Sequence, residues 1–207
     1  MRWDVGIDLG TESVRMAVKN EGPVLSTAAR LAFREGRDTP ICGGDVAKSI
    51  AGRSCEGVRV VSPLKDGVLE SNFTADRMFN WMYRQLDASV RKRKFNTIIT
   101  CAPFARPVQQ EAMLSAAIDA GATSAALVRS DAAVALGAGM ELNEPDAKLL
   151  VDIGAGKITA TLFTFGRVAA FAYLPYGLNR IDERIQRIIR TESGYRIGLD
   201  SAREKSH

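Results

Sequence analysis

Two stretches of the sequence, Asp8-Leu9-Gly10-Thr11 and Asp152-Ile153-Gly154-Ala155-Gly156, place a carboxylate at the end of an apolar run and a glycine-containing turn directly after it. A carboxylate in that position is costly to bury unless it is paired or holds a cation. Successive backbone N–H groups in such a turn can form a concave site for an anion, and the Thr11 hydroxyl adds a donor. The residue types therefore predict phosphate-binding turns at Gly10, Thr11 and Glu12 and at Gly154, Ala155, Gly156 and Lys157.

The repetition of the pattern carries more weight than either copy. One such turn alone is usually a structural hairpin, whereas a duplicated pair at the starts of two similar segments favours nucleotide binding. If both turns face one ligand, they hold a polyphosphate between them. Asp8 and Asp152 then hold Mg²⁺, largely through its bound waters.

Length and composition exclude several classes of protein. The chain has 207 residues, of which 25% are charged and 46% hydrophobic, so it predicts one large folded domain or two small ones. Its net charge of +4 is too small for a nucleic-acid-binding protein, and we expect no nucleic-acid partner. The single histidine, His207, excludes Ser-His-Asp and Cys-His catalysis and multi-histidine metal sites. The sequence shows no signal peptide or bilayer-spanning run, and its three scattered cysteines fit reduced thiols, so we expect a cytoplasmic protein.

Apolar periodicity predicts the elements that position the turns. Strands are expected at Val5–Leu9, Val14–Val18, from Val24, and at Val58–Val61, Thr97–Cys101, Ala125–Val128, Lys148–Ile153, Ile158–Phe165 and Arg167–Leu174. Helices are expected at Asp45–Ala51, Thr74–Val90, Pro107–Ala120, Asp131–Met140 and Ile181–Arg190, with polar stretches at Arg34–Gly44 and Ser201–His207. Thr74 is the expected N-cap of its helix, whose Met78, Phe79, Met82 and Leu86 form a core-facing side. Strands that alternate with helices predict crossovers and a parallel part of the sheet.

Five short motifs carry a resemblance to a known family. They are GIDLGT at Gly6–Thr11, AKSIAGR at Ala47–Arg53, PLKDGV at Pro63–Val68, ALGAG at Ala135–Gly139 and VDIGAG at Val151–Gly156. By these motifs the sequence resembles the MreB-type bacterial actin homologues, within the actin-like ATPases, over nearly its whole length. PLKDG is the most specific of them. Sugar kinases and heat-shock chaperones share the glycine turns, but PLKDG disfavours both.

The resemblance implies an α/β, ribonuclease H-like actin-type lobe, a mixed sheet with βββαβα order, and the beginning of a second similar lobe. The first lobe is expected at residues 1–145, with a small inserted subdomain at about 28–62, and the incomplete second lobe at 146–207. The resemblance also implies ATP and Mg²⁺ as cofactors, self-assembly into membrane-associated filaments, and a role with the cell-shape machinery.

The sequence departs from the family where water would be positioned for hydrolysis. The family has an acidic pair before the interdomain helix, whereas this chain has Arg129-Ser130-Asp131. Arginine cannot orient or deprotonate water as a carboxylate does, which leaves Asp131 as the catalytic candidate and helix capping as its alternative role. In the second turn Ala155 adds a Cβ and Lys157 reaches either a phosphate or solvent, and the family's later double glycine becomes Gly177-Leu178-Asn179.

The rest of the family's second lobe, with its adenosine loop, has no counterpart in this sequence. A second hypothesis is therefore a truncated or degenerate relative that does not hydrolyse ATP and acts as an interaction module or is a gene fragment.

Two basic features have alternative interpretations. The run Arg91, Lys92, Arg93, Lys94 and Phe95 is either a solvated loop or a contact with an anionic membrane into which Phe95 inserts. Lys48 is either an exposed helix lysine or, as in related chaperones, a lysine near the γ-phosphate.

Overall fold

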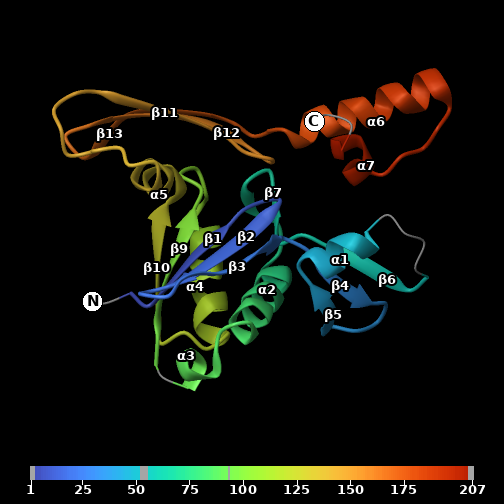
Figure 1. Cartoon of the computed structure of the whole chain (residues 1–207), viewed down its shortest axis with the longest axis horizontal. Helices are drawn as coiled ribbons and strands as arrows, with labels where there is room; N and C mark the ends of the chain where they lie inside the picture. The colour runs from blue at the N-terminus through green and yellow to red at the C-terminus, as the bar shows by residue number, and fades with distance from the viewer. Residues whose placement is uncertain (1–2, 52–55, 93, 205–207) are drawn as a thin grey trace. The chain divides into compact units, whose positions relative to one another are not determined.

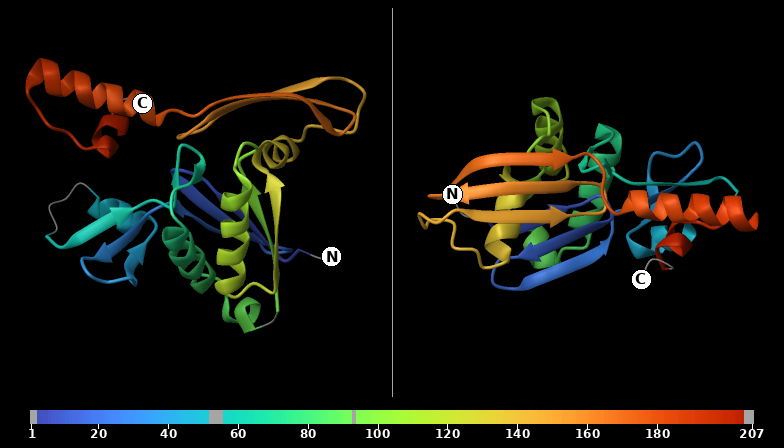
Figure 2. Two further views of the ribbon diagram at one scale, coloured as in Figure 1. Left: turned by 180° about the vertical axis from the view of Figure 1, so that it is seen from behind. Right: turned by 90° about the horizontal axis from the view of Figure 1, so that it is seen from above.

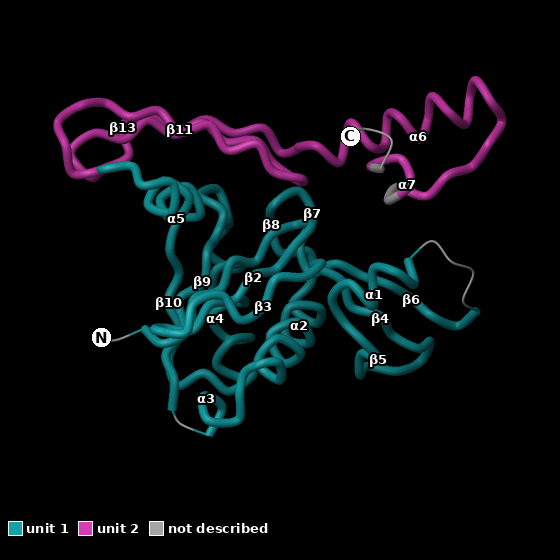
Figure 3. Tube along the Cα trace, viewed as in Figure 1, with its two compact units in different colours: residues 1–141 teal, residues 142–207 magenta. Residues whose placement is uncertain are grey.

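The computed structural model describes residues 3–51, 56–92 and 94–204. The chain divides into two compact units, residues 1–141 and 142–207, and each is described by itself (Figure 3).

A five-stranded mixed sheet forms the centre of unit 1. Its strands are β1 (Val5–Leu9), β2 (Ser13–Val18), β3 (Gly22–Ala28), β9 (Asn96–Cys101) and β10 (Ser124–Arg129), in the order β10-β9-β1-β2-β3. β1, β2 and β3 pair antiparallel, whereas β9 pairs parallel with both β1 and β10. This sheet confirms the expected mixed topology, with βββ followed by alternating helices and strands (Figure 1).

Two helices cover one face of this sheet, α2 (Asn72–Arg84) and α4 (Pro107–Asp119) (Figures 1 and 2). Unit 1 also contains the shorter helices α3 (Ala88–Lys92) and α5 (Ser130–Gly137). The core joins alternate residues of the strands to the inner side of α2, and includes the predicted set Met78, Phe79, Met82 and Leu86. The side-chain alternation of β1 thus buries Val5, Ile7 and Leu9 to 1%, 2% and 4% exposure.

The single helix expected at Thr74–Val90 is wrong in its bounds. The segment forms α2 and α3, separated by a break at Gln85–Asp87. Ser71, not Thr74, is the N-cap residue of α2. Thr74 lies in the first turn of α2. Its hydroxyl donates a hydrogen bond of 2.9 Å to the Ser71 carbonyl three residues earlier, so it bonds to the backbone of its own helix.

A small separate sheet with one short helix follows β3, to the side of the main sheet (Figure 1). It contains β4 (Leu31–Arg34), β5 (Pro40–Gly43) and β6 (Val58–Val61), in the order β5-β4-β6, with α1 (Asp45–Ile50). The polar stretch noted at Arg34–Gly44 contains a strand that the sequence analysis did not predict, because β4 ends at Arg34 and β5 covers Pro40–Gly43.

The PLKDG motif forms a hairpin of β7 (Leu64–Lys65) and β8 (Val68–Leu69). Its two turn residues, Asp66 and Gly67, have φ angles of 50° and 82°. Positive φ at both central residues is the type I′ geometry, which Asp-Gly pairs adopt readily.

Unit 2 begins with an antiparallel sheet of three strands. They are β11 (Lys148–Ile153), β12 (Ile158–Thr164) and β13 (Arg167–Leu174), in that order, followed by α6 (Asn179–Ser193) and α7 (Leu199–Glu204). The polar tail noted at Ser201–His207 begins inside α7, which ends at Glu204 and was not predicted, and His207 lies outside the described residues. No helix in the described part of the chain is both long and apolar enough to span a bilayer.

Candidate functional site

The two predicted turns have the same backbone geometry in their separate units. In loop 1 (Gly10–Ser13) the Gly10 N–H donates to the Ser13 carbonyl at 3.0 Å, and in loop 2 (Gly154–Lys157) the Gly154 N–H donates to the Lys157 carbonyl at 2.9 Å. Each loop connects two antiparallel strands, β1 to β2 and β11 to β12. A Cβ at Gly10 would lie only 2.8 Å from the Ser13 carbonyl oxygen, so glycine is required there for space.

Loop 1 is held in place by residues far along the sequence. The Thr11 carbonyl accepts hydrogen bonds from Arg30 Nη1 at 3.1 Å and from the Ser62 hydroxyl at 3.3 Å. The Thr11 hydroxyl accepts a hydrogen bond from the Gly67 N–H at 3.1 Å, which joins the PLKDG hairpin to loop 1. Within the described ranges the Thr11 N–H donates no hydrogen bond, and it remains available to an anion.

Glu12 lies between two cations. Lys48 Nζ is 2.9 Å from Glu12 Oε1, and Arg30 Nη2 is 2.8 Å from Glu12 Oε2. The interpretation of Lys48 as an exposed helix lysine is wrong, because its side chain is only 31% exposed and ends at loop 1. Sequence reasoning placed Glu12 in the loop but missed both of its ion pairs.

Asp8 lies one residue before the end of β1, beside loop 1, and already has two partners. Its Oδ1 accepts a hydrogen bond of 2.8 Å from the Thr100 hydroxyl on β9, and its Oδ2 pairs with Arg15 Nη1 at 3.1 Å from the opposite position on β2. A carboxylate has about four acceptor positions, so both contacts leave lone pairs for the waters of a cation. Asp8 therefore fits a magnesium ion held through water. No group of three acidic, histidine or cysteine ligands occurs in the described part of the chain.

Loop 2 is closed by the start of α6. The N–H groups of Leu178 and Asn179 donate to the carbonyls of Gly154 and Ala155 at 3.0 and 2.9 Å. A Cβ on Gly177 would overlap the Gly154 carbonyl oxygen and come within 2.8 Å of two further backbone atoms. Asp152 and Lys157 are half-buried in this unit. The departure noted at Gly177-Leu178-Asn179 thus marks a close backbone contact with loop 2.

Asp131 is engaged by its neighbour Arg129. The carboxylate is fully buried, and it accepts hydrogen bonds from Arg129 Nε at 3.1 Å and Arg129 Nη2 at 2.6 Å. The capping interpretation is wrong, because Arg129 occupies the N-cap position of α5 and Asp131 follows inside the first turn. With both oxygens bound to a guanidinium, Asp131 is poorly placed to orient a water molecule.

The basic run divides between surface and core. Arg91, Lys92 and Lys94 are exposed, whereas Arg93 lies outside the described residues. Phe95 is only 3% exposed and packs edge-on against Tyr83, with ring centroids 5.1 Å apart. The alternative in which Phe95 inserts into a membrane is therefore wrong, because the ring belongs to the core of unit 1.

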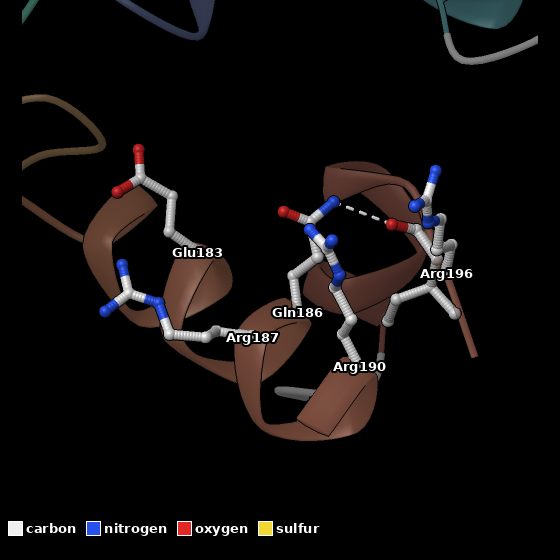
Figure 4. A pocket seen from close by; sticks show the side chains of 6 residues that line it. Glu183, Gln186, Arg187, Arg190 and Arg196 are labelled. Carbon is white, nitrogen blue, oxygen red and sulfur yellow. Dashed lines mark hydrogen bonds between the residues drawn. The ribbon is translucent and has the colours of Figure 1, made fainter. Parts of the chain in front are cut away.

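Unit 2 also has a cavity of about 590 Å³ on α6 and the segment after it (Figure 4). It is lined by Glu183, Gln186, Arg187, Arg190, Arg196 and Ile197. The Gln186 side chain closes one wall by donating to the Ile197 carbonyl at 2.6 Å. None of the predicted phosphate or magnesium residues lines this cavity, so it is separate from loop 2.

The family model described as MreB/Mbl protein matches residues 2–206. The chain is 29% identical over 209 residues to the cell shape-determining protein MreB of Escherichia coli strain K12, covering 99% of this chain and 60% of that protein. It is 28% identical over 201 residues to the cell shape-determining protein Mbl of Bacillus subtilis strain 168, covering 97% and 60%. The chain thus spans about three fifths of the length of these relatives.

Solved structures show the same fold. MreB5 of Spiroplasma citri bound to AMPPNP superposes with a TM-score of 0.89 at 24% identity, over 97% of this chain and 60% of that one. The MamK double helical filament superposes with a TM-score of 0.78 at 19% identity, over 96% and 62%. These likenesses confirm the expected actin-like fold.

Proposed function

The chain belongs to the MreB/Mbl family, and from this membership we propose that it is an actin-like cell-shape protein that binds ATP with Mg²⁺ through loops 1 and 2. The observation that supports this most is the repeated turn, in which the same glycine hydrogen bond closes loop 1 and loop 2. Unit 1 corresponds to the first lobe and unit 2 to the opening of the second.

In this proposal the backbone of loop 1 holds the phosphates. The open Thr11 N–H and the Thr11 hydroxyl are its donors, while Gly10 gives the backbone the space to turn. Gly154, Ala155, Gly156 and Lys157 form the corresponding surface of unit 2. Asp8 and Asp152 hold Mg²⁺ through water, and the ion supplies charge neutralisation for the phosphates when bound.

We further propose that hydrolysis is slow. The family's acidic pair is replaced by Arg129-Ser130-Asp131, and the Asp131 carboxylate is bound on both oxygens by Arg129. This arrangement agrees with a chain that binds ATP and hydrolyses it slowly. Such a chain can still act as a filament subunit.

Self-association and membrane contact belong to the same proposal. The MamK structure is that of a filament, and a filament is the assembly we infer for this chain. We place the protein in the cytoplasm, at the membrane surface, with the cell-shape machinery as partner. Arg91, Lys92 and Lys94 provide exposed positive charge, worth about 1 kcal/mol each near an anionic surface.

Calorimetric titration with Mg-ATP tests the nucleotide proposal. We expect saturable binding by the wild type, and binding about tenfold weaker for Asp8→Asn because a neutral amide holds the waters of Mg²⁺ less strongly. Asp38→Asn, at an exposed position of the same unit, is the matched control and should bind as the wild type does. Absence of heat with the wild type at millimolar Mg-ATP would contradict the proposal and favour the interaction-module hypothesis.

Pelleting tests the assembly proposal. With Mg-ATP and liposomes containing anionic lipid, we expect the chain in the pellet, and less of it when Arg91, Lys92 and Lys94 are all changed to glutamine. Recovery only in the supernatant, with and without liposomes, would count against both filament and membrane contact.

Arg15 gives a smaller prediction about magnesium. Its guanidinium pairs with Asp8 while 62% exposed, so it competes weakly with a cation for the carboxylate. Arg15→Gln is expected to tighten Mg²⁺-dependent ATP binding roughly two- to fivefold, as measured by magnesium titration at fixed ATP. Weaker binding in this variant would instead show that Arg15 contacts the phosphates.

A further inference from the structure

Three arginines of unit 2 line one cavity, which we call the arginine cavity (Figure 4). Arg187 and Arg190 lie three residues apart on α6, which makes them neighbours on the surface of the helix. Arg196 reaches the same cavity from the segment that follows α6. Glu183 is the one acidic residue of the lining, so three arginines against one glutamate leave a net charge of +2.

The end of α6 brings the third arginine to the other two. The helix ends at its C-cap residue Gly194, whose φ of 72° is left-handed and turns the chain away from the helix axis. Three residues later the Ile197 carbonyl accepts a hydrogen bond of 2.6 Å from Gln186 Nε2 on α6. This bond joins the segment after the helix to the helix itself. Arg196, the residue before Ile197, is thereby held at the cavity.

The positive charge of the arginine cavity is not neutralised within the part of unit 2 that the structure describes. There, the guanidinium groups of Arg187, Arg190 and Arg196 form no ion pair or hydrogen bond. Glu183 is engaged by another arginine, Arg180, with 3.0 Å between its Oε2 and Arg180 Nη1. Like charges three residues apart on a helix repel each other, so this gathering of cations costs stability unless an anion joins it.

We propose that the arginine cavity binds the phosphate group of a small ligand, at a site separate from loops 1 and 2. A guanidinium donates two parallel hydrogen bonds to phosphate oxygens, and it loses less hydration than an ammonium in doing so. A terminal phosphate offers three acceptor oxygens to three arginines, whereas one guanidinium already satisfies both oxygens of a carboxylate. The volume of about 590 Å³ is that of a small-molecule site, and Ile197 adds an apolar wall.

Chemical modification by phenylglyoxal, read for each arginine by mass spectrometry, tests this site separately from the two loops. In the full chain with EDTA present, inorganic pyrophosphate should slow the modification of Arg187, Arg190 and Arg196 several-fold. Arg184 is the matched control, because it is exposed on the same helix and does not line the cavity. Its modification rate should not change. Acetate at the same ionic strength should protect none of these arginines, because a carboxylate needs only one guanidinium.

A pair of variants tests whether the arginines bind the ligand together. In the double variant Arg190→Gln, Arg196→Gln, about tenfold or more pyrophosphate should be needed to protect Arg187, the effect of losing charge-assisted hydrogen bonds. Arg184→Gln removes one charge from the same helix and should leave the protection of Arg187 as in the wild type. Vesicles containing phosphatidic acid present the phosphate on a lipid instead. Protection of Arg187 by these vesicles and not by pyrophosphate would identify a headgroup as the source of the phosphate.

Three results would overturn the inference. They are unchanged modification of the cavity arginines with both probes, equal protection of Arg184, and equal protection by acetate. The double variant should bind Mg-ATP as the wild type does, and a loss of that binding would show that the cavity is not a separate site. If the wild type fails to bind Mg-ATP while pyrophosphate still protects the cavity arginines, the proposed function fails and this inference stands.

Discussion

A Gly177→Ala variant is expected to destabilise unit 2 by about 2–4 kcal/mol, the range of mutations that force a backbone clash in a packed site. The added methyl would overlap the Gly154 carbonyl oxygen and crowd the Ala155 carbonyl oxygen and the Lys157 nitrogen at 2.8 Å. All three are backbone atoms of loop 2, so relief requires moving the loop or the start of α6. Either movement breaks the hydrogen bonds from Leu178 and Asn179 that join the two segments.

Hydrogen exchange measures this effect within unit 2. Amides of β11 and β12 should exchange faster in Gly177→Ala, while those of β1 and β2 in unit 1 should keep their wild-type rates. Gly198→Ala is the matched control in the same unit, because a Cβ there has no heavy atom within 4 Å. Unchanged protection of β11 and β12 in Gly177→Ala would show that the close approach is not maintained in solution.

The hairpins around both loops could be predicted from the sequence because their signals are local. Alternating apolar residues and a glycine turn are sufficient to define β1–β2 and β11–β12 and the pairing of their strands. The helical side that packs on the main sheet was also visible, as a 3.6-residue repeat. These elements fix where Asp8, Asp152 and the loop glycines lie along their strands.

Burial of those strands could not be predicted, because it depends on what covers them. Val5, Ile7 and Leu9 alternate along β1 and are nearly inaccessible under α2 and α4. Leu149, Val151 and Ile153 show the same alternation along β11, yet they are 63%, 53% and 56% exposed. The pattern identifies a side of a strand, whereas burial requires a covering layer that the described part of unit 2 does not provide for these residues.

The missed features of the site depend on contacts between residues distant in sequence. Thr11 meets Gly67 across 56 residues, and Glu12 meets Lys48 across 36. A helix periodicity places Lys48 on α1 but does not say where its ammonium ends. The same limit applies to Phe95, which follows a basic run and yet packs in the core against Tyr83.

Tyr83 makes unit 1 sensitive to alkaline pH. Burial raises the pKa of its hydroxyl from 10.0 to about 12. Because the folded-state pKa is the higher one, the contribution of Tyr83 to stability is fully present below pH 10. Above that pH the unfolded chain ionises while the folded chain does not, so stability is lost until the folded-state pKa is reached. A difference of two pH units corresponds to a loss of about 2.7 kcal/mol.

Urea unfolding of unit 1 at a series of pH values, compared with Tyr83→Phe, isolates this effect from the other tyrosines and lysines. The phenylalanine variant lacks this ionisation. Between pH 10 and 12 the free energy of unfolding of the wild type should therefore fall by about 2.7 kcal/mol more than that of Tyr83→Phe. Tyr195→Phe, at a side chain that is 72% exposed, should follow the wild type throughout.

Below pH 10 the Tyr83→Phe variant should be at least as stable as the wild type, because the Tyr83 hydroxyl is buried without a hydrogen-bond partner among the described residues. Parallel curves for wild type and Tyr83→Phe across the alkaline range would mean that water reaches the hydroxyl and that the edge-on packing of Tyr83 on Phe95 is open in solution.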